Sequence, residues 1–170
     1  MIKKIRKKRF LHLVNLWIIN HFLCGQRFYK LKLFLLKRIG VTVGESVKIV
    51  GPLHFGNMVK LSIGNGTFIN HHFYIEGNGN VTIGSNCDIA PFVVFLTGTH
   101  EIGDANRRAG KGRVLSISLG NGCWIGARST LCGCGLGNGC VVGCNSCVMN
   151  DFDSNIVLYN EKAKERKRLG

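Results

Sequence analysis

The chain has 170 residues, 45% of them hydrophobic, and a formal net charge of +14, which suits a single domain with a buried core. Glycine is frequent, with 23 residues against 2 prolines, and no tract is of low complexity, so the composition excludes a disordered chain. The charge would permit a nucleic-acid binder, but the sequence holds no basic and aromatic motif of a known nucleic-acid-binding module.

The N-terminal segment, residues 1–40, is basic and apolar, with eleven Lys and Arg residues and no acid. Its apolar run from Phe10 to Cys24 is too short and too polar for a membrane-spanning helix, and no small-residue cleavage site follows it. The pattern predicts amphipathic helices, for which two interpretations stay open. They could lie on a membrane surface, or they could cap the end of a repeat fold.

A six-residue period governs most of the remaining chain. Apolar anchors stand at Ile63, Ile69 and Ile75 and, after a two-residue insert at 81–82, continue at the same spacing from Ile83, with one five-residue unit at Leu131. This period fits neither an α-helix nor an alternating strand, and it is typical of a parallel β-helix. Three units would form one triangular coil, so that each anchor stacks on an anchor of the next coil. The sequence therefore predicts an all-β solenoid of hexapeptide repeats over residues 41–159.

The cysteines follow the same period. Cys87, Cys123 and Cys140 stand four residues after their anchors, where Ser129 and Ser146 stand in other units. A position that takes both Cys and Ser indicates a small side chain pointing inward. We therefore expect reduced thiols, and we expect no zinc or iron–sulfur site because the sequence lacks paired Cys-x-x-Cys motifs.

The period stops where the stretch "FLTGTH" ends at His100, and it returns at Leu119. Residues 98–117 are expected to be an irregular loop extruded from the solenoid, and residues 160–170 a basic tail. A regular stack presents only flat walls, so an extruded loop can reach across a subunit interface and form a cleft. Flat walls with few charges also favour threefold packing, and we expect a homotrimer.

The segment "IGSNCDIAPFVVFLTGTHEIGDANRRAG", with "GNGCWIGARST" and "LGNGCVVGCNS" after it, resembles the hexapeptide-repeat acyltransferases. The most similar branch is that of the maltose and galactoside O-acetyltransferases and the sugar O-acetyltransferases of polysaccharide assembly. The resemblance covers roughly residues 41–165. It implies a left-handed parallel β-helix, a homotrimer with active sites between neighbouring subunits, and acetyl-CoA as co-substrate, with no metal.

The family's catalytic histidine corresponds to His100, at the base of the extruded loop. An imidazole that titrates near neutral pH can remove the proton of a sugar hydroxyl as the hydroxyl attacks a thioester. The group that orients this histidine stays open between Glu101, Asp104 and a backbone carbonyl. The plain alternative is a histidine that only anchors the loop by hydrogen bonds.

The resemblance also assigns binding residues. Asn70 matches a family asparagine that touches the acceptor sugar, although it could be an ordinary corner residue, and Trp124 could instead pack an interface. Contacts with the CoA phosphates stay open, because the family's usual residues are replaced near the C-terminus. The residues implied for CoA binding are Trp124, Gly126, Ala127, Cys144 and Lys164, and further candidates for its phosphates are Arg107, Arg108 and Arg166.

The implied function is a CoA-dependent O-acetyltransferase that acts on a hydroxyl of a sugar in a surface polysaccharide or its precursor. We expect a cytoplasmic protein, attached peripherally to the anionic inner face of the membrane if residues 1–40 bind lipid. Two other functions stay open: an antibiotic acetyltransferase of the related branch, and a β-helix scaffold without activity. A zinc carbonic anhydrase on the same fold is disfavoured, because it needs three histidines on one metal and none closely follows His100.

Overall fold

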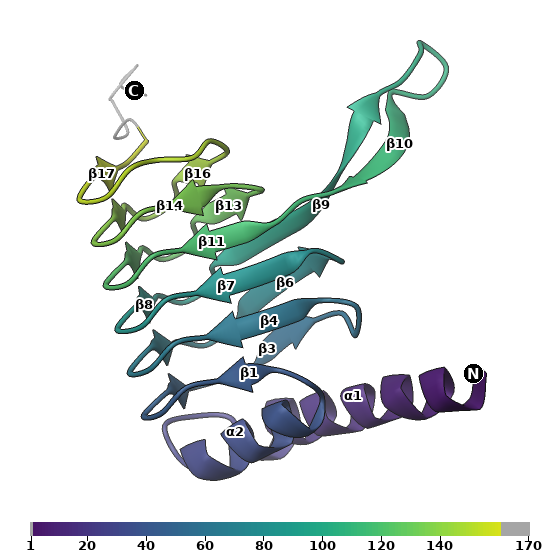
Figure 1. Cartoon of the computed structure of the whole chain (residues 1–170), viewed down its shortest axis with the longest axis vertical. Helices are drawn as coiled ribbons and strands as arrows, with labels where there is room; N and C mark the ends of the chain where they lie inside the picture. The colour runs from purple at the N-terminus through teal and green to yellow at the C-terminus, as the bar shows by residue number, and fades with distance from the viewer. Residues whose placement is uncertain (1, 161–170) are drawn as a thin grey trace, which may run out of the picture.

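The structure, a computed structural model, describes residues 2–160 and all of their side chains except those of residues 2–5 and 7. Two helices, α1 (Ile2–Phe22) and α2 (Tyr29–Arg38), precede a column of short parallel strands (Figure 1). The column has three walls, which we call sheets A, B and C. The chain passes through them in that order in each coil. This architecture confirms the predicted solenoid of triangular coils.

Each wall is a parallel sheet that takes one strand from each coil. Sheet A consists of β1 (Thr42–Val43), β4 (Lys60–Ile63), β7 (Asn80–Ile83), β11 (Ile117–Leu119) and β14 (Gly135–Leu136). Sheet B consists of β2 (Lys48–Ile49), β5 (Phe68–Ile69), β8 (Asp88–Ile89), β12 (Trp124–Ile125), β15 (Val141–Val142) and β17 (Val157–Leu158). Sheet C consists of β3 (Leu53–Phe55), β6 (Phe73–Gly77), β9 (Val94–Ile102), β13 (Thr130–Cys132) and β16 (Cys147–Val148).

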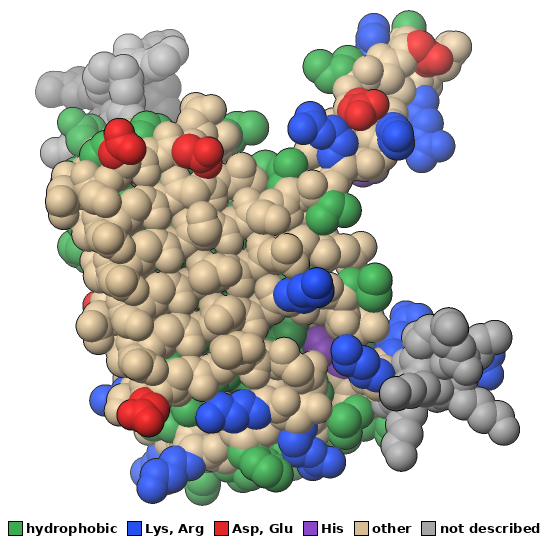
Figure 2. Space-filling view, in the orientation of Figure 1, with side chains coloured by type: hydrophobic (Ala, Val, Ile, Leu, Met, Phe, Trp, Pro, Cys, Tyr) green, Lys and Arg blue, Asp and Glu red, His purple; other side chains and the backbone are tan. Residues whose placement is uncertain are grey.

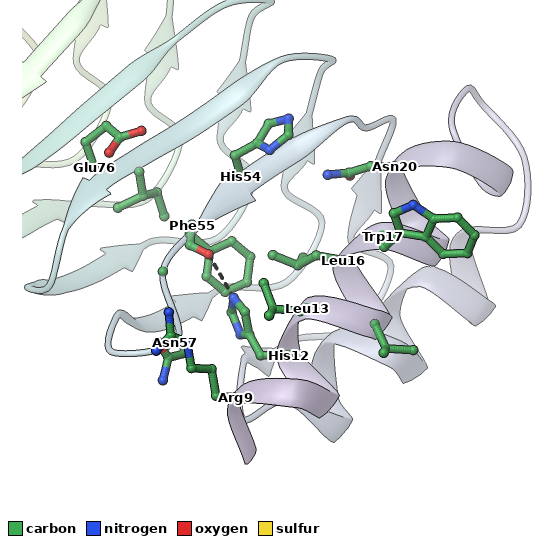
Figure 3. Close-up of a pocket in the computed structure, with 13 residues that line it drawn as sticks. Arg9, His12, Leu13, Leu16, Trp17, Asn20, His54, Phe55, Asn57 and Glu76 are labelled. Carbon is green, nitrogen blue, oxygen red and sulfur yellow. Dashed lines mark hydrogen bonds between the residues drawn. The ribbon is translucent and has the colours of Figure 1, made fainter. Parts of the chain in front are cut away.

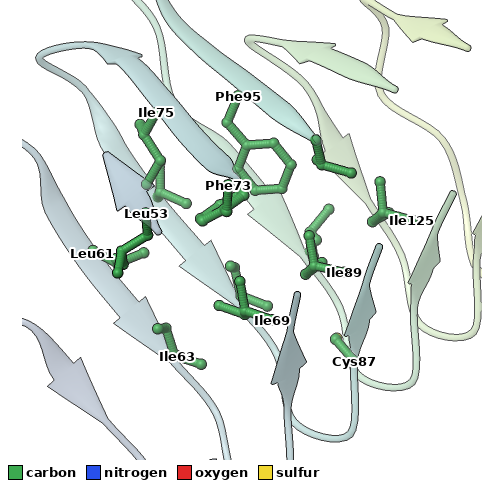
Figure 4. Close-up of a cluster of buried hydrophobic side chains, with 14 of the residues drawn as sticks. Leu53, Leu61, Ile63, Ile69, Phe73, Ile75, Cys87, Ile89, Phe95 and Ile125 are labelled. Atoms are coloured by element: carbon green, nitrogen blue, oxygen red, sulfur yellow. The ribbon is translucent and has the colours of Figure 1, made fainter. Parts of the chain in front are cut away.

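The apolar anchors point into the column and stack from coil to coil. Ile63 pairs with Ile83 in sheet A, and Ile69 pairs with Ile89 in sheet B. Figure 4 shows anchor side chains from the three walls meeting in one buried cluster. A fully buried side chain of this kind contributes about 1.5–3 kcal/mol. The six-residue period therefore carries the hydrophobic stabilisation of the column.

The corner between sheets A and B depends on small residues after the anchors. A side chain at Gly64, which follows Ile63, would place its Cβ 2.5 Å from the backbone nitrogen of Ser85 in the next coil. Two residues further on, Gly66 has a φ of 68°, and Asn86 in the next coil has a φ of 55°. Glycine and asparagine adopt this left-handed conformation most easily. Gly and Asn thus close this corner in these two coils.

The inward cysteines are reduced, as predicted, and none of the eight forms a disulfide. The Sγ–H of Cys87 donates to the carbonyl of Gly120 at 3.2 Å, and that of Cys123 donates to the carbonyl of Gly137 at 3.1 Å. Burial raises the pKa of both thiols because it disfavours the charged thiolate. These cysteines act as small interior residues and not as nucleophiles.

The N-terminal helices cover the open end of the column (Figure 1), which confirms the cap interpretation. Lys32 of α2 is fully buried, and its Nζ donates hydrogen bonds to the carbonyls of Gly25, Ile49 and Val50. No helix within residues 2–160 is long and apolar enough to cross a membrane. The helix residues buried in the core are Leu16, Ile19, Leu35 and Leu36, and Leu23, just after α1, is buried with them.

The excursion that starts within β9 is a β-hairpin and not the expected irregular loop. β9 continues beyond the wall and pairs in the antiparallel sense with β10 (Ala109–Val114). The Oδ1 of Asp104 closes the tip by accepting hydrogen bonds from the N–H groups of Asn106 and Arg107. Strand pairing satisfies backbone groups that an irregular excursion would leave to solvent. Figure 1 shows the hairpin projecting beyond the column, and Figure 2 shows Lys and Arg gathered on it.

Candidate active site

A shallow hollow on the outer face of sheet B brings two of the predicted residues together. Asn70 and Trp124 both line it, with Asp88 between them, and its volume is about 310 Å³. The strand register explains this grouping, since Asp88 of β8 pairs with Phe68 on one side and with Trp124 on the other. The indole of Trp124 is 57% exposed. The six-residue repeat therefore places side chains from three successive coils one above another on this wall.

Asn70 can offer a hydrogen-bond donor to a ligand in the hollow. Its Oδ1 accepts the backbone N–H of His71 at 2.8 Å, which fixes the orientation of the side chain. The Nδ2 group makes no hydrogen bond within the described part of the chain, and the side chain is only half-buried. A fixed amide with a free donor suits recognition of a hydroxyl oxygen.

Three further predicted residues meet at the corner between sheets B and C. Gly126 donates its N–H to Val142 at 2.7 Å, and a Cβ on it would lie 2.6 Å from the backbone nitrogen of Cys144. The carbonyl of Ala127 accepts the N–H of Asn145 at 2.9 Å. Gly126 and Ala127 thus lie on one coil, and Cys144 lies on the next. The close spacing of these two coils is by itself enough to require glycine at position 126. The predicted cofactor residue Lys164 lies outside the described residues.

His100 stands on the projecting part of β9. It is exposed and lies opposite Gly112, and a Cβ on that glycine would be 4.0 Å from the imidazole Cδ2. Its ring makes no hydrogen bond to any residue within 2–160. The tip hydrogen bonds occupy Oδ1 of Asp104, so this carboxylate serves the turn. Glu101 is exposed beside His100 and makes no side-chain hydrogen bond in the described chain.

The hairpin face that carries His100 also carries exposed aliphatic side chains. Residues two apart on a strand share a face, so Ile102 lies on the same face as His100. Val114 lies there too, because it pairs with Gly98. Ile102 is 90% exposed and Val114 is 68% exposed. Ile102 and Val114 thus form a small exposed apolar surface on the same face as the imidazole.

One chain does not bring His100 to the sheet B hollow. Figure 1 shows the hairpin leaving the column on the side opposite β8, the strand that carries Asp88. The predicted residues therefore fall into two groups: the sheet B wall with its corner, and the hairpin. Within residues 2–160, no three His, Cys, Asp or Glu side chains lie close enough to hold a metal ion.

Sequence reasoning missed Asp88. Its carboxylate is exposed in the hollow between Asn70 and Trp124. The signal was present, because Asp88 and Trp124 each precede an apolar anchor and so share one position of the repeat.

No family model matches the chain.

Two curated relatives of the chain are acetyltransferases by name. The chain is 32% identical to the galactoside O-acetyltransferase of Escherichia coli K12 over 93 residues, which are 55% of the chain and 46% of that protein. It therefore spans about half the length of this relative. A Dictyostelium discoideum protein, named as an acetyltransferase, is 30% identical over 136 residues, which are 79% of the chain and 72% of that protein.

Solved structures show the same fold. The hexapeptide-repeat acetyltransferase VCA0836 of Vibrio cholerae, complexed with acetyl-CoA, has a TM-score of 0.76 at 25% identity and covers 92% of this chain and 84% of its own. A galactoside acetyltransferase with coenzyme A has a TM-score of 0.73 at 25% identity, over 91% and 77%. The polySia-specific acetyltransferase NeuO has a TM-score of 0.62 at 29% identity, over 75% and 61%.

A triangular column of six-residue repeats with an extruded hairpin defines the class of left-handed parallel β-helix proteins. The chain belongs to the hexapeptide-repeat acetyltransferase family, since the Dictyostelium relative matches it over 72% of its own length and the VCA0836 structure shares its fold over 84% of that chain.

Proposed function

We propose that the protein is an O-acetyltransferase that moves the acetyl group of acetyl-CoA to a hydroxyl of a sugar in a surface polysaccharide or its precursor. The observation that carries this proposal is the meeting of Trp124, Gly126, Ala127 and Cys144 on adjacent coils. These are the residues that the family resemblance assigns to the CoA arm. Structural neighbours hold acetyl-CoA or CoA, and two of the relatives are named for a galactoside and for polysialic acid.

The active site is proposed to form between two copies of the chain in a homotrimer. His100 of one copy would reach the sheet B wall of its neighbour, where Asn70 and Trp124 stand. The exposed Ile102 and Val114 support this arrangement, because docking of the hairpin would remove both from water. Such a cleft holds the acceptor and the thioester in one orientation, which lowers the entropic part of the barrier.

The proposed reaction needs one base, and it replaces the carbon–sulfur bond of the thioester with a carbon–oxygen bond to the acceptor. The acceptor hydroxyl oxygen attacks the thioester carbonyl carbon while His100 takes the hydroxyl proton. Collapse of the tetrahedral intermediate breaks the carbon–sulfur bond, and His100 returns the proton to the CoA thiolate. The free Nδ2 of Asn70 would hold a hydroxyl of the acceptor. General-base catalysis of this kind contributes at least about 100-fold to the rate.

A thiol-release assay tests this function. The full chain is given acetyl-CoA and a panel of galactosides, short oligosaccharides and nucleotide sugars, and free CoA is measured. We expect release with at least one sugar and a loss of at least about 100-fold in His100→Ala. The matched control is Lys60→Ala, an exposed change on sheet A. Full activity in His100→Ala would rule out the proposed base, and no release with any acceptor would count against the function.

The capping helices are proposed to attach the protein to an anionic membrane. They expose several aromatic side chains beside a basic segment without acids, and α1 and α2 together form the base of the column. Each Lys or Arg near an anionic bilayer contributes about 1 kcal/mol, and aromatic side chains insert at the interface. Sedimentation with anionic liposomes but not with neutral ones is the expected result. The exposed apolar residues are Phe10, Leu13, Trp17, Phe22, Phe28, Leu31 and Phe34.

A further inference from the structure

A second cavity lies between α1 and the edge of sheet C, at the base of the column (Figure 3). Its volume is about 690 Å³, which is in the range of small-molecule binding sites. One wall comes from α1, and the other comes from β3 and β6. None of the residues assigned to acetyl transfer lines it, so it is separate from the candidate active site.

Polar contacts hold α1 beside sheet C and keep the cavity open. β3 is the edge strand of that sheet, and its backbone faces the helix. The Nε2 of His12 contacts the carbonyl of Phe55 at 2.8 Å. Two helical turns further on, the side-chain amide of Asn20 donates to the carbonyl of Leu53 at 2.8 Å and accepts its N–H at 3.0 Å. The helix is thus fixed at two points, and the cavity lies along the segment between them.

The floor and the rim of the cavity are apolar. Leu16, Phe55 and Ile75 are buried and form the floor, while Leu13 and Trp17 remain 59% and 52% exposed at the rim. Figure 3 shows both rim side chains on the helix that faces the strands. A preformed apolar cavity with an open apolar rim binds a hydrocarbon group by removing its surface from water.

The position of Trp17 is set by its neighbours. Its indole stacks on His21, with ring centroids 5.2 Å apart, and meets the edge of Phe22 at 5.2 Å. Because Phe22 is exposed, the apolar surface continues from the cavity onto the free side of α1. A bound hydrocarbon could therefore extend out of the cavity along the helix. A long chain fits this shape better than a compact ring does.

The charged groups lie at separate places around the cavity. Arg9 stands beside Asn57 at one end, and Glu76 lies on the strand side, away from Arg9 (Figure 3). His54 stacks on Tyr74 with ring centroids 4.6 Å apart. The described part of α1 holds no acid that would neutralise Arg9. An arginine with an amide beside it is suited to a phosphate group.

We infer that this cavity binds a long-chain alkyl or prenyl phosphate, with its hydrocarbon between Leu13, Leu16 and Trp17 and its phosphate at Arg9. Both membrane lipids and lipid-linked sugar precursors carry this combination of chain and phosphate. The inference deepens the proposed attachment of the helices to a membrane. It does not depend on acetyl transfer, because a soluble sugar acceptor would not need the cavity.

Binding can be followed through Trp17 in the full chain. The sequence has two tryptophans, so a Trp124→Phe background leaves Trp17 as the only indole. The probes are farnesyl phosphate and dodecyl phosphate, each kept below its micelle concentration. We expect a saturable blue shift of the emission with one probe bound per chain. The tighter probe identifies the source, prenyl for a lipid-linked precursor and alkyl for a membrane lipid.

Three controls make the test specific. Leu13→Glu puts a charge on the rim and should weaken binding of both probes at least about tenfold, whereas Leu31→Glu, an exposed change on α2 outside the cavity, should leave it unchanged. Arg9→Gln should weaken farnesyl phosphate but not farnesol. Glucose 1-phosphate, which has a phosphate and no chain, should not bind. Thiol release with a soluble sugar should persist in Leu13→Glu made in the parent chain, which keeps Trp124, so this test can fail independently of the catalytic one.

Equal binding by Leu13→Glu and the parent protein would overturn the inference. So would a lack of any saturable change with both probes, or binding of glucose 1-phosphate as tight as that of farnesyl phosphate. Circular dichroism and the melting temperature of each variant are measured first. A folded Leu13→Glu protein is expected, because Leu13 is exposed and makes no part of the buried core.

Discussion

His100 lies directly opposite Gly112 in the β9–β10 hairpin, and a Cβ at position 112 would come to 4.0 Å from the imidazole Cδ2. The glycine leaves room beside the ring. We predict that Gly112→Val crowds His100 and lowers kcat/KM at least about tenfold, while the melting temperature changes little because the strand is exposed. Arg113→Val, on the opposite face of β10, is the matched control and should keep most of the activity. Equal losses in both variants would contradict a specific effect on His100.

Mixed trimers test whether the active site is shared between chains. His100→Ala and Asn70→Ala should each be nearly inactive alone. If a site takes His100 from one copy and Asn70 from the next, a mixture refolded together regains on the order of a quarter of the parent activity. The regain comes from sites whose two residues are both intact. Mixing the two proteins without refolding is the control, and no regain after refolding would show that the site does not cross a subunit boundary.

Ser46 is a weak point of the first coil. It has a φ of 56° at the corner where the following coils have Gly66, Asn86 and Gly122. Because an L-residue with a Cβ is strained there, Ser46→Gly should raise the free energy of unfolding by about 0.5–1 kcal/mol. Gly122→Ala should lower it by about 1 kcal/mol. Urea denaturation measures both, and a loss of stability in Ser46→Gly would contradict the strain argument.

Lys32 joins the cap to the column through three backbone carbonyls. Lys32→Met keeps the apolar stem but removes the ammonium donor from these carbonyls, of which that of Val50 still accepts the N–H of Gly25. We expect a loss of about 3 kcal/mol in the free energy of unfolding, since buried groups without partners are costly. Lys37→Met, an exposed change at the end of the same helix, should stay within about 0.5 kcal/mol. Similar values for the two variants would show that the buried contacts do not stabilise the cap.

His54 should make stability depend on pH. Burial is the largest cause that lowers its pKa below 6.5, and the charge of His72 adds to this effect while Glu76 opposes it. Between the lowered pKa and 6.5, the unfolded chain binds more protons than the folded one, so stability rises with pH in this window. The stability that depends on neutral His54 is fully present above pH 6.5 and is lost as the pH falls through the lowered pKa. Urea midpoints from pH 5 to pH 8 should show this slope, and His54→Gln should flatten it.

The repeat and the residues on its walls could be predicted because equivalent positions of each unit need the same kind of side chain. An anchor such as Ile69 must be apolar to enter the core, and a corner such as Gly64 must be small because the next coil is close. Once the six-residue register was known, Asn70 and Trp124 had to share a wall. Asp88 could have been found by the same reasoning, since its position in the repeat equals that of Trp124.

The hairpin and the helix cavity were beyond this reasoning. The excursion after Phe95 has no six-residue period, so the pairing of β9 with β10 depends on contacts that the repeat does not describe. The cavity depends on where α1 meets an edge strand, through His12 and Asn20. Neither residue belongs to a pattern, because both act by reaching a backbone carbonyl far away in the sequence.

The amino-acid sequence alone determined the column, because every six-residue unit needs an apolar anchor that enters the core and small residues that form a tight corner. Only the folded chain decided that His100 leaves the column away from Asn70, and that α1 stands off sheet C. The physical reason is that packing between distant segments depends on single contacts in space. These contacts leave no period in the sequence from which they could be read.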